Sequence, residues 1–309
     1  MLIAKELVLY IILSLFFFKI FYKYISKYII DRPVYRSSHV GDIPTSAGII
    51  FLLIYTIYVL LNNKYRLLIL LPIGIIGFLD DIFNIKQSYR FCFQSINIFL
   101  TFLLFFNFNF FSDLTFFNIL ISLLVLFIGL TLVNIINFMD GIDGLVAINM
   151  FLILLNYSLS NNLDLIAIPI VLFVFLFYNW SPAKIFMGDS GSTFLGLLLF
   201  YITFAKNDFN SAVIVLLTTA PLLMDSLICI LRRIRNKENI FLPHKKHLYQ
   251  RLYQKGMKHS KVSTIYAFCT SILLIFSHTN NLIIMTSLAL FVFIIGIYLE
   301  KYHALPFNF

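Results

Sequence analysis

Aspartates occur in pairs at the ends of apolar segments of this chain. Asp80 and Asp81 are adjacent after one such segment, and Asp140 and Asp143 are three residues apart after another. Carboxylate oxygens are good ligands for Mg²⁺, and neighbouring carboxylates repel unless a metal ion, a lysine or a proton offsets their charge. This spacing is compatible with metal binding or acid–base chemistry. For Asp80 and Asp81 alone, a solvated helix end is the simpler interpretation.

The segment 134–144 is the richest in such groups. It contains Asn134, Asn137, Asp140, Asp143 and two glycines within eleven residues. Hard oxygen ligands suit Mg²⁺, amides can bind a phosphate or a nucleobase, and glycine lets a backbone approach a ligand closely. An ordinary loop would seldom have this composition. We therefore predict a metal and nucleotide site here.

Small polar residues precede another apolar run, in the segment Phe186-Met-Gly-Asp189-Ser190-Gly-Ser192. The first N–H groups of a helix, together with its dipole, attract anions such as phosphate. Asp189 would repel a phosphate there unless a cation lay between them. The segment therefore predicts a metal–diphosphate site, and the alternative is an ordinary Asp or Ser helix cap.

A long basic loop, 232–261, carries His244, Lys246, His247 and Arg251. Its cations could hold a nucleotide diphosphate or contact anionic lipid. The two histidines are three residues apart, but no Cys or third His lies near them in the sequence. A zinc site is therefore not predicted.

Two single residues are further candidates. Thr45 follows Pro44 at what is expected to be a helix start. Asp225 lies inside an apolar segment, where an ionisable side chain is costly and is by default a candidate functional residue.

The elements that must position these residues follow from composition. Of 309 residues, 61% are hydrophobic and only 12% are charged, whereas soluble domains usually contain about 25% charged residues. Such a chain belongs in a bilayer, which about 20 apolar residues cross as a helix. The apolar runs lack the alternation of a β-barrel. We predict an all-α, polytopic helical bundle with about ten or eleven transmembrane helices, over 2–22, 46–62, 66–79, 91–110, 116–135, 144–159, 163–179, 192–205, 211–231, 262–278 and 282–299.

Lysine and arginine define the expected orientation. Of 23 such residues, all but Lys5, Lys64, Arg66 and Lys206 fall in one set of loops or at helix ends beside them. This asymmetry places those loops in the cytoplasm, the N-terminus outside and the C-terminus inside. It also explains the net charge of +9 without a nucleic-acid partner.

We expect one domain over 1–309, with catalytic loops at 24–45, 80–90, 134–144, 180–192 and 232–261. The cysteines, Cys92, Cys229 and Cys269, lie in apolar runs and are expected to be buried.

Together the motifs resemble those of the polyprenyl-phosphate N-acetylhexosamine-1-phosphate transferases, glycosyltransferase family 4. The matching stretches occur in the family's order at 44–48, 77–85, 134–145, 186–196, 221–233 and 243–252. The resemblance implies transfer of an amino-sugar 1-phosphate from a UDP-N-acetyl amino sugar to undecaprenyl phosphate, with release of UMP. It also implies Mg²⁺, with Mn²⁺ as an alternative, and an active site at the cytoplasmic face of a bacterial inner membrane.

The resemblance also assigns roles residue by residue. Asp80 matches the aspartate proposed to deprotonate the lipid phosphate, and Asp81 matches its essential neighbour. Asp189, with Asn137, matches the metal site. The expected donor-binding residues are Asn134, Asp140, Asp143, Lys184, Ser190, His244, Lys246, His247 and Arg251, while Thr45 and Asp225 match family segments without an assigned role.

Two departures bear on the donor. Ala47 replaces the first glycine of a pair that the family commonly has, and the loop reads His-Lys-Lys-His rather than a run of histidines. The chain is in this respect closer to the enzymes that prime O-antigen-type polysaccharides than to the peptidoglycan enzyme that makes lipid I.

A secondary transporter and a catalytically silent membrane scaffold are the competing hypotheses. The chemistry is open between direct attack and a covalent aspartyl intermediate, and a homodimer is compatible with the sequence.

Overall fold

The computed structural model describes residues 2–33, 38, 41–105, 116–161, 163–206, 208–239, 242 and 244–307. Part of the loop 24–45 and the end of the predicted span 91–110 lie outside these residues. The helices are α1 (Leu2–Ile20), continued by the π-helix η1 (Phe21–Ile25), α2 (Gly48–Leu61), the 3₁₀-helix η2 (Tyr65–Leu70), α3 (Leu71–Phe83), α4 (Gln87–Phe105), α5 (Phe116–Met139), α6 (Leu145–Ser160), α7 (Ala167–Asn179), α8 (Gly188–Phe204), α9 (Phe209–Thr218), α10 (Ala220–Arg235), α11 (Leu248–Gln254), α12 (His259–Ser277) and α13 (Leu282–His303).

The chain is a polytopic helical membrane protein, as its composition predicts. Five stretches of the described residues are helical, long and apolar enough to cross a bilayer: Lys5–Tyr24, Gln87–Phe105, Asn118–Met139, His259–Ser277 and Leu282–His303. A sixth is obtained if α9 and α10 count as one bent span. Large apolar side chains point outward from these helices, for example Leu123 and Phe127 of α5, which are 58% and 67% exposed. Such outward apolar faces suit contact with lipid.

Each predicted span overlaps a helix over its described residues, but two of them are not continuous α-helices. The span predicted over 211–231 is broken at Thr219, where α9 and α10 meet at an angle of 78°. Pro221 lies in the first turn of α10, and proline has no backbone N–H to continue a helix through this point. The span predicted over 66–79 begins as the 3₁₀-helix η2, and Pro72 lies in the first turn of α3.

Helix α8 lies at the centre of the bundle. Every residue from Ser190 to Thr203 is buried, and α2, α3 and α5 pack around this helix. Close approach needs small residues, and Gly77 of α3 supplies one. A methyl group on Gly77 would lie 2.4 Å from the carbonyl oxygen of Asp189. The backbone of α3 is therefore in direct contact with the first turn of α8.

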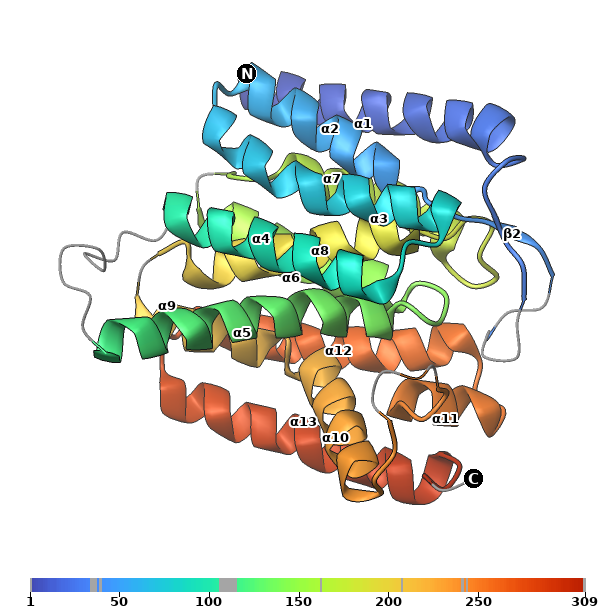
Figure 1. Ribbon diagram of the computed structural model, residues 1–309, viewed down its shortest axis with the longest axis vertical. Coiled ribbons are helices and arrows are strands. Elements are labelled where there is room, and N and C mark those ends of the chain that lie inside the picture. The colour runs from blue at the N-terminus through green and yellow to red at the C-terminus, as the bar shows by residue number, and fades with distance from the viewer. Residues whose placement is uncertain are drawn as a thin grey trace.

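The candidate loops gather at one end of the bundle. Two short strands, β1 (Ile30–Asp31) and β2 (Ile43–Pro44), pair antiparallel there, with Ile30 opposite Pro44. Figure 1 shows β2, α11 and the C-terminus at this end and the N-terminus at the other.

One cysteine differs from expectation. Cys229 and Cys269 are buried, but Cys92 is exposed. It lies near the start of α4, a helix with many of its apolar side chains turned outward.

Candidate active site

Asp81 holds the first turn of α8. Its carboxylate accepts hydrogen bonds from the Ser46 hydroxyl at 2.7 Å, from the Asp189 N–H at 2.9 Å and from the Ser190 N–H at 3.4 Å. Gly188 begins this turn at a φ of +69°, and a side chain on it would collide with Asp81. A carboxylate at the N-terminus of a helix satisfies N–H groups that have no partner within the helix.

Arg90 links two carboxylates from different helices. One of its nitrogens, Nη1, lies 2.5 Å from Asp80 Oδ2, and Nη2 lies 2.6 Å from Asp189 Oδ2. The other oxygen of Asp80 accepts the Ile85 N–H at 2.7 Å, just after α3 ends. Arg90 thus offsets charge that Asp80 and Asp189 would otherwise leave unpaired.

Asn137 joins the same group from α5. Its amide nitrogen lies 2.9 Å from both Asp189 Oδ1 and the Ser192 hydroxyl. We call Asp80, Asp81, Asn137 and Asp189, with Arg90 and Ser46, the carboxylate cluster. Its members come from α3, α4, α5, α8 and the loop before α2, so five segments distant in sequence meet at one point.

Negative charge dominates the electrostatics of the carboxylate cluster and of the neighbouring Asp140. Burial, followed by the neighbouring Asp189, raises the pKa of Asp80 to about 6 against the opposing effect of Arg90. Burial and Asp189 likewise raise the pKa of Asp81 to about 7. For Asp140, burial and the charges of Asp189 and Asp81 raise the pKa to about 8. No described lysine, arginine or histidine forms an ion pair with Asp140. These carboxyls share more negative charge than Arg90 neutralises.

The residues at this site fit a Mg²⁺ or Mn²⁺ ion that is shared with a substrate. Within the described part of the chain, no three carboxylates bring oxygens within 4.8 Å of one another, so the protein forms no complete cage. Mg²⁺ usually takes one or two protein carboxylates and completes its shell with water and phosphate oxygens. Asp189, whose charge acts on Asp140, offers carboxylate oxygens, and Asn137, which bonds Asp189 through its amide nitrogen, also carries an amide oxygen. This donor set suits that binding mode.

Asp143 lies in the same loop as Asp140 but has other partners. Its Oδ2 accepts the Ala183 N–H at 3.1 Å and lies 3.2 Å from His259 Nδ1. Its backbone oxygen accepts the Ser263 hydroxyl at 2.7 Å. Burial raises the pKa of Asp143, but His259 and the Ala183 N–H outweigh it, and the net pKa lies below the ordinary value. Asp143 ties the loop before α6 to the loop before α8 and to α12.

Four other predicted residues make no direct contact with the carboxylates of the cluster through their side chains. The Asn134 amide donates to Leu130 O at 2.8 Å and faces Gln94 at 3.5 Å. The buried Ser190 hydroxyl bonds Met187 O, and Lys184 is exposed. Thr45 is half-buried, and its neighbour Ser46 makes the bond to Asp81.

The basic loop is anchored by Asp225. This carboxylate accepts the N–H groups of Leu248 and Tyr249, at 2.7 and 3.1 Å, and the Tyr266 hydroxyl at 2.6 Å. His247 Nδ1 lies 3.6 Å from Asp225 Oδ1. Asp225, unexplained by its sequence, therefore caps α11 and fixes the position of the histidines.

Lys246 and Arg251 form their ion pairs with residues outside the carboxylate cluster. Lys246 pairs with Glu238 at 2.7 Å. Arg251 is 4% exposed, and it binds Glu300 at 2.7 Å and Leu305 O at 2.9 Å. Both cations lie about 5.3–5.4 Å from the ring of Phe307. They hold the C-terminal segment against α10 and α11.

Helix α11, which lies within the basic loop, contacts the segment that follows Asn137 of the carboxylate cluster. The Tyr249 hydroxyl donates to Phe138 O at 2.9 Å, and a methyl group on Gly141 would meet that hydroxyl. The segment 138–141 contains Asp140 and follows Asn137. The loop after α5 therefore has the carboxylates on one side and α11 on the other.

Two residues that contact the site, Arg90 and Ser46, are not among those that the motifs predict. The position of Arg90, ten residues after Asp80, is the one signal for it in the sequence. No pattern at Ser46 distinguishes its hydroxyl from that of Thr45.

Comparison with known proteins adds an independent finding. A family model described as Glycosyl transferase family 4 matches residues 63–206. This range contains Asp80, Asp81, Asn137 and Asp189, but neither Asp225 nor the histidines.

Individual relatives extend the match. The chain is 35% identical over 144 residues to the probable undecaprenyl-phosphate N-acetylglucosaminyl 1-phosphate transferase of Bacillus subtilis, covering 43% of this chain and 40% of that protein. It is 34% identical over 171 residues to the decaprenyl-phosphate N-acetylglucosaminephosphotransferase of Mycobacterium leprae, covering 45% and 43%. It is 32% identical over 229 residues to the phospho-N-acetylmuramoyl-pentapeptide-transferase of Petrotoga mobilis, covering 61% and 70%. The matched part of the chain thus spans about two fifths of the first two relatives and more than two thirds of the third.

Proposed function

Because this chain belongs to glycosyl transferase family 4, we propose that it transfers an N-acetylated amino-sugar 1-phosphate from a UDP-sugar to a polyprenyl phosphate. The acceptor in this proposal is undecaprenyl phosphate, and UMP is released. The reaction takes place at the cytoplasmic face of a bacterial inner membrane and starts a cell-envelope polysaccharide. The N-terminus then lies outside and the C-terminus in the cytoplasm.

The carboxylate cluster is the observation that carries this proposal. An acceptor with an isoprenoid chain and a phosphate head, and a donor that is soluble and highly charged, must meet at the edge of the bilayer. The cluster lies at the end of the bundle where loops from α3, α5 and α8 converge. Its surplus of negative charge can be balanced by a divalent cation, which the phosphates of donor and acceptor also require.

Different residues of the carboxylate cluster are proposed to accept the proton, to hold the metal ion and to position the carboxylates. In this proposal Asp81 or Asp80 accepts a proton from the acceptor phosphate, and their pKa values of about 7 and about 6 support this role near neutral pH. Asp189 and Asn137 would hold Mg²⁺ or Mn²⁺, which supplies charge neutralisation for the donor diphosphate and for the departing UMP. Arg90 keeps Asp80 and Asp189 in place through its two nitrogens.

Two chemical routes are consistent with this arrangement. In the direct route, an oxygen of the lipid phosphate bonds to the sugar-bearing phosphorus as the bond to UMP breaks. In the covalent route, Asp81 forms that bond first and the lipid phosphate displaces it. Asp81 already accepts three hydrogen bonds, which engage both of its oxygens and hold the carboxylate against the first turn of α8, so neither oxygen is free to approach a phosphorus atom. This observation favours the direct route.

The donor is proposed to be a UDP-N-acetylglucosamine-type sugar. The names of the first two relatives specify N-acetylglucosamine, and the His-Lys-Lys-His loop departs from the histidine run of the peptidoglycan enzyme. The Petrotoga mobilis relative, 70% of which is matched, is a phospho-N-acetylmuramoyl-pentapeptide-transferase, so synthesis of lipid I is the second candidate.

The test is a reconstituted reaction. Purified protein in detergent is mixed with undecaprenyl phosphate and a panel of UDP-sugars, including UDP-N-acetylglucosamine and UDP-N-acetylmuramoyl-pentapeptide, with and without Mg²⁺. UMP is measured and the lipid product is identified by mass spectrometry. We expect a Mg²⁺-dependent lipid-linked sugar phosphate from one donor, and its loss in Asp189→Asn.

The outcomes separate the competing hypotheses. Full activity of Asp189→Asn would overturn the metal assignment. Substrate uptake into proteoliposomes without a covalent lipid product would indicate a transporter. A well-folded protein that forms no product with any donor would indicate a scaffold. A labelled sugar phosphate trapped on Asp81 would establish the covalent route.

A further inference from the structure

Three side chains with soft metal ligands meet beside α11. Cys229 is on α10, while His244 and His247 are in the basic loop, 15 and 18 residues further along the chain. One ligand atom from each lies within 4.8 Å of the other two. We propose that Cys229, His244 and His247, here called the histidine cluster, bind a divalent d-block cation with the ligand preference of Zn²⁺. This corrects the sequence interpretation, which found no cysteine near the histidines.

The tertiary structure explains how this group is assembled. Asp225 and Cys229 are four residues apart and lie on the same face of α10. Asp225 accepts the first N–H groups of α11, and this bond places His247, the residue before α11, next to that face. The rings of His244 and His247 stack with centroids 5.0 Å apart. Asp225 therefore positions His247, His244 stacks on His247, and α10 itself places the thiol beside them.

The distances suit a tetrahedral ion. Zinc binds sulfur at about 2.3 Å and histidine nitrogen at about 2.0–2.1 Å, which puts ligand atoms about 3.5 Å apart. The observed limit of 4.8 Å is within reach of small side-chain rotations. Three protein ligands leave a fourth position for water, which is the arrangement of open zinc sites rather than of closed structural ones.

The type of ligand excludes the ion proposed for the carboxylate cluster. Thiolate and imidazole prefer Zn²⁺ and related cations, whereas Mg²⁺ prefers oxygen ligands. The two sites would therefore hold different metals. No carboxylate belongs to the histidine cluster, so Mg²⁺ is not expected to compete for it.

The surroundings of His247 match those of a metal ligand. Its Nδ1 is buried and makes no hydrogen bond to any described residue, and it faces Asp225 at 3.6 Å. Histidines that bind metals commonly direct their second nitrogen toward a carboxylate, which fixes the ring and makes it a better ligand. A modest movement of the ring toward Asp225 would complete this pair and leave Nε2 for the ion.

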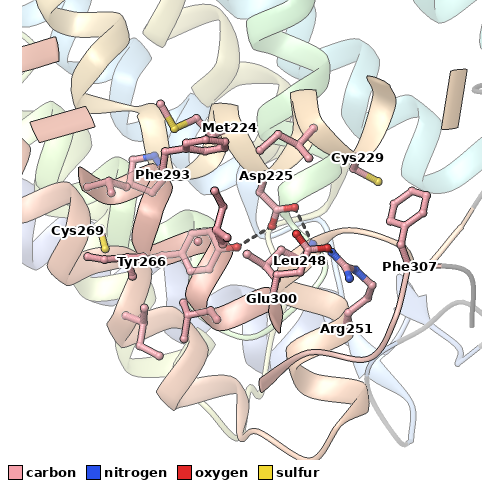
Figure 2. A pocket seen from close by; sticks show the side chains of 18 of the residues that line it. Met224, Asp225, Cys229, Leu248, Arg251, Tyr266, Cys269, Phe293, Glu300 and Phe307 are labelled. Carbon is pink, nitrogen blue, oxygen red and sulfur yellow. Dashed lines mark hydrogen bonds and ion pairs between the residues drawn. The ribbon is translucent and has the colours of Figure 1, made fainter. Parts of the chain in front are cut away.

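One ligand of the histidine cluster borders a cavity. Cys229 and Asp225 line a cavity of about 320 Å³ between α10, α12 and α13. Figure 2 shows both side chains on the wall of this cavity, with Phe307 and Arg251 nearby. The thiol of Cys229 is therefore next to open space, which alkylation can probe.

The experiment uses Co²⁺ as a spectroscopic substitute for Zn²⁺. The full-length protein is purified in detergent, its affinity tag is removed, and it is treated with chelator and titrated with Co²⁺. We expect one Co²⁺ per chain and a thiolate-to-cobalt charge-transfer band that Zn²⁺ abolishes. Cys229→Ser should lose the band, and His244→Ala should weaken binding at least about tenfold.

Cys269→Ser is the matched control, because Cys269 is also buried and also lines the cavity but lies outside the histidine cluster. It should keep the band. Thermal melting of each variant shows whether it is folded, and protection of Cys229 from alkylation by Zn²⁺ gives a second readout. Absence of a thiolate band in the folded protein, or a band that persists in Cys229→Ser, would refute the site. Neither readout depends on transferase activity.

Discussion

The carboxylate cluster and the histidine cluster lie on either side of the loop after α5, yet they are built in opposite ways. The first is made where helix ends meet: Asp81 caps α8, and Arg90 and Asn137 reach it from α4 and α5. The second is made by a loop that one carboxylate, Asp225, fastens to a helix face. Helix ends give rigid placement, whereas the loop depends on its anchor.

The two regions also differ in how completely the charge of their carboxylates is compensated. In the carboxylate cluster, Arg90 balances only part of the negative charge, and Asp140 has no ion-pair partner among the described residues. Beside the histidine cluster, the charge of Asp225 is fully engaged by two N–H groups and a hydroxyl. We infer that acidic residues serve chemistry in the first region and architecture in the second. Substitutions should separate these roles.

Asp81→Asn should have the largest effect on activity. The amide removes a negative charge and brings an N–H₂ group toward three hydrogen-bond donors. The rate of UMP release should fall about 10³-fold, equivalent to about 4 kcal/mol. Initial rates at saturating substrate measure it, with Asp208→Asn as control, because Asp208 is an exposed cap of α9. If Asp81→Asn kept the rate of that control, the division of roles would fail.

Asp225→Asn should instead act on stability. It weakens three hydrogen bonds and the pairing with His247, so the free energy of unfolding should fall by about 2–4 kcal/mol. Thermal melting in detergent and limited proteolysis of the loop 232–261 report the change. Tyr266→Phe removes only one of the three bonds and should cost about 1 kcal/mol. Equal losses in the two variants would contradict the anchoring role.

Arg90→Lys tests whether activity requires the two guanidinium nitrogens that bind Asp80 and Asp189, or only the positive charge. Lysine keeps the charge but cannot bond Asp80 and Asp189 with two coplanar nitrogens. We expect a roughly tenfold lower rate, about 1.4 kcal/mol, with little change in melting temperature. Arg235→Lys, an exposed position on α10, is the control. An unchanged rate in Arg90→Lys would show that charge alone is sufficient.

The smallest effect is expected from the pH dependence of Asp143. Its pKa in the folded chain lies below the unfolded value of about 3.9, so the ionised form stabilises the fold above that pH. The contribution, about 1 kcal/mol, should disappear as the pH falls through the lower folded pKa. Melting curves of the wild type and Asp143→Asn should therefore differ at pH 7, begin to approach each other below about pH 4, and converge below the folded pKa. A difference that grew in acid would have the wrong sign.

The sequence determined the class of the protein and most of its elements. Low charge and long apolar runs leave a helical membrane bundle as the only solution, because lipid satisfies no backbone hydrogen bonds. The motifs around Asp80, Asn137 and Asp189 could be recognised because each combines polar groups with an apolar helix end. A hydropathy profile shows how apolar a segment is, but not whether its helix is straight. The bend at Thr219 and the 3₁₀-helix η2 before α3 therefore leave no break in the apolar runs.

What only the tertiary structure decided is which side chains touch. Within the segment 134–144, Asn137 reaches Asp189, whereas Asn134 bonds its own helix and Asp143 bonds His259. Sequence shows these as one motif, since it records spacing and not the face of the helix or the path of the loop. Cys229 gives the clearest case. His244 and His247 are 15 and 18 residues away from it in the sequence, so spacing does not reveal them as neighbours. The hydrogen bond from α11 to Asp225 brings the two histidines beside Cys229. Hydrophobicity fixes elements one at a time, but a site depends on how several elements are held together.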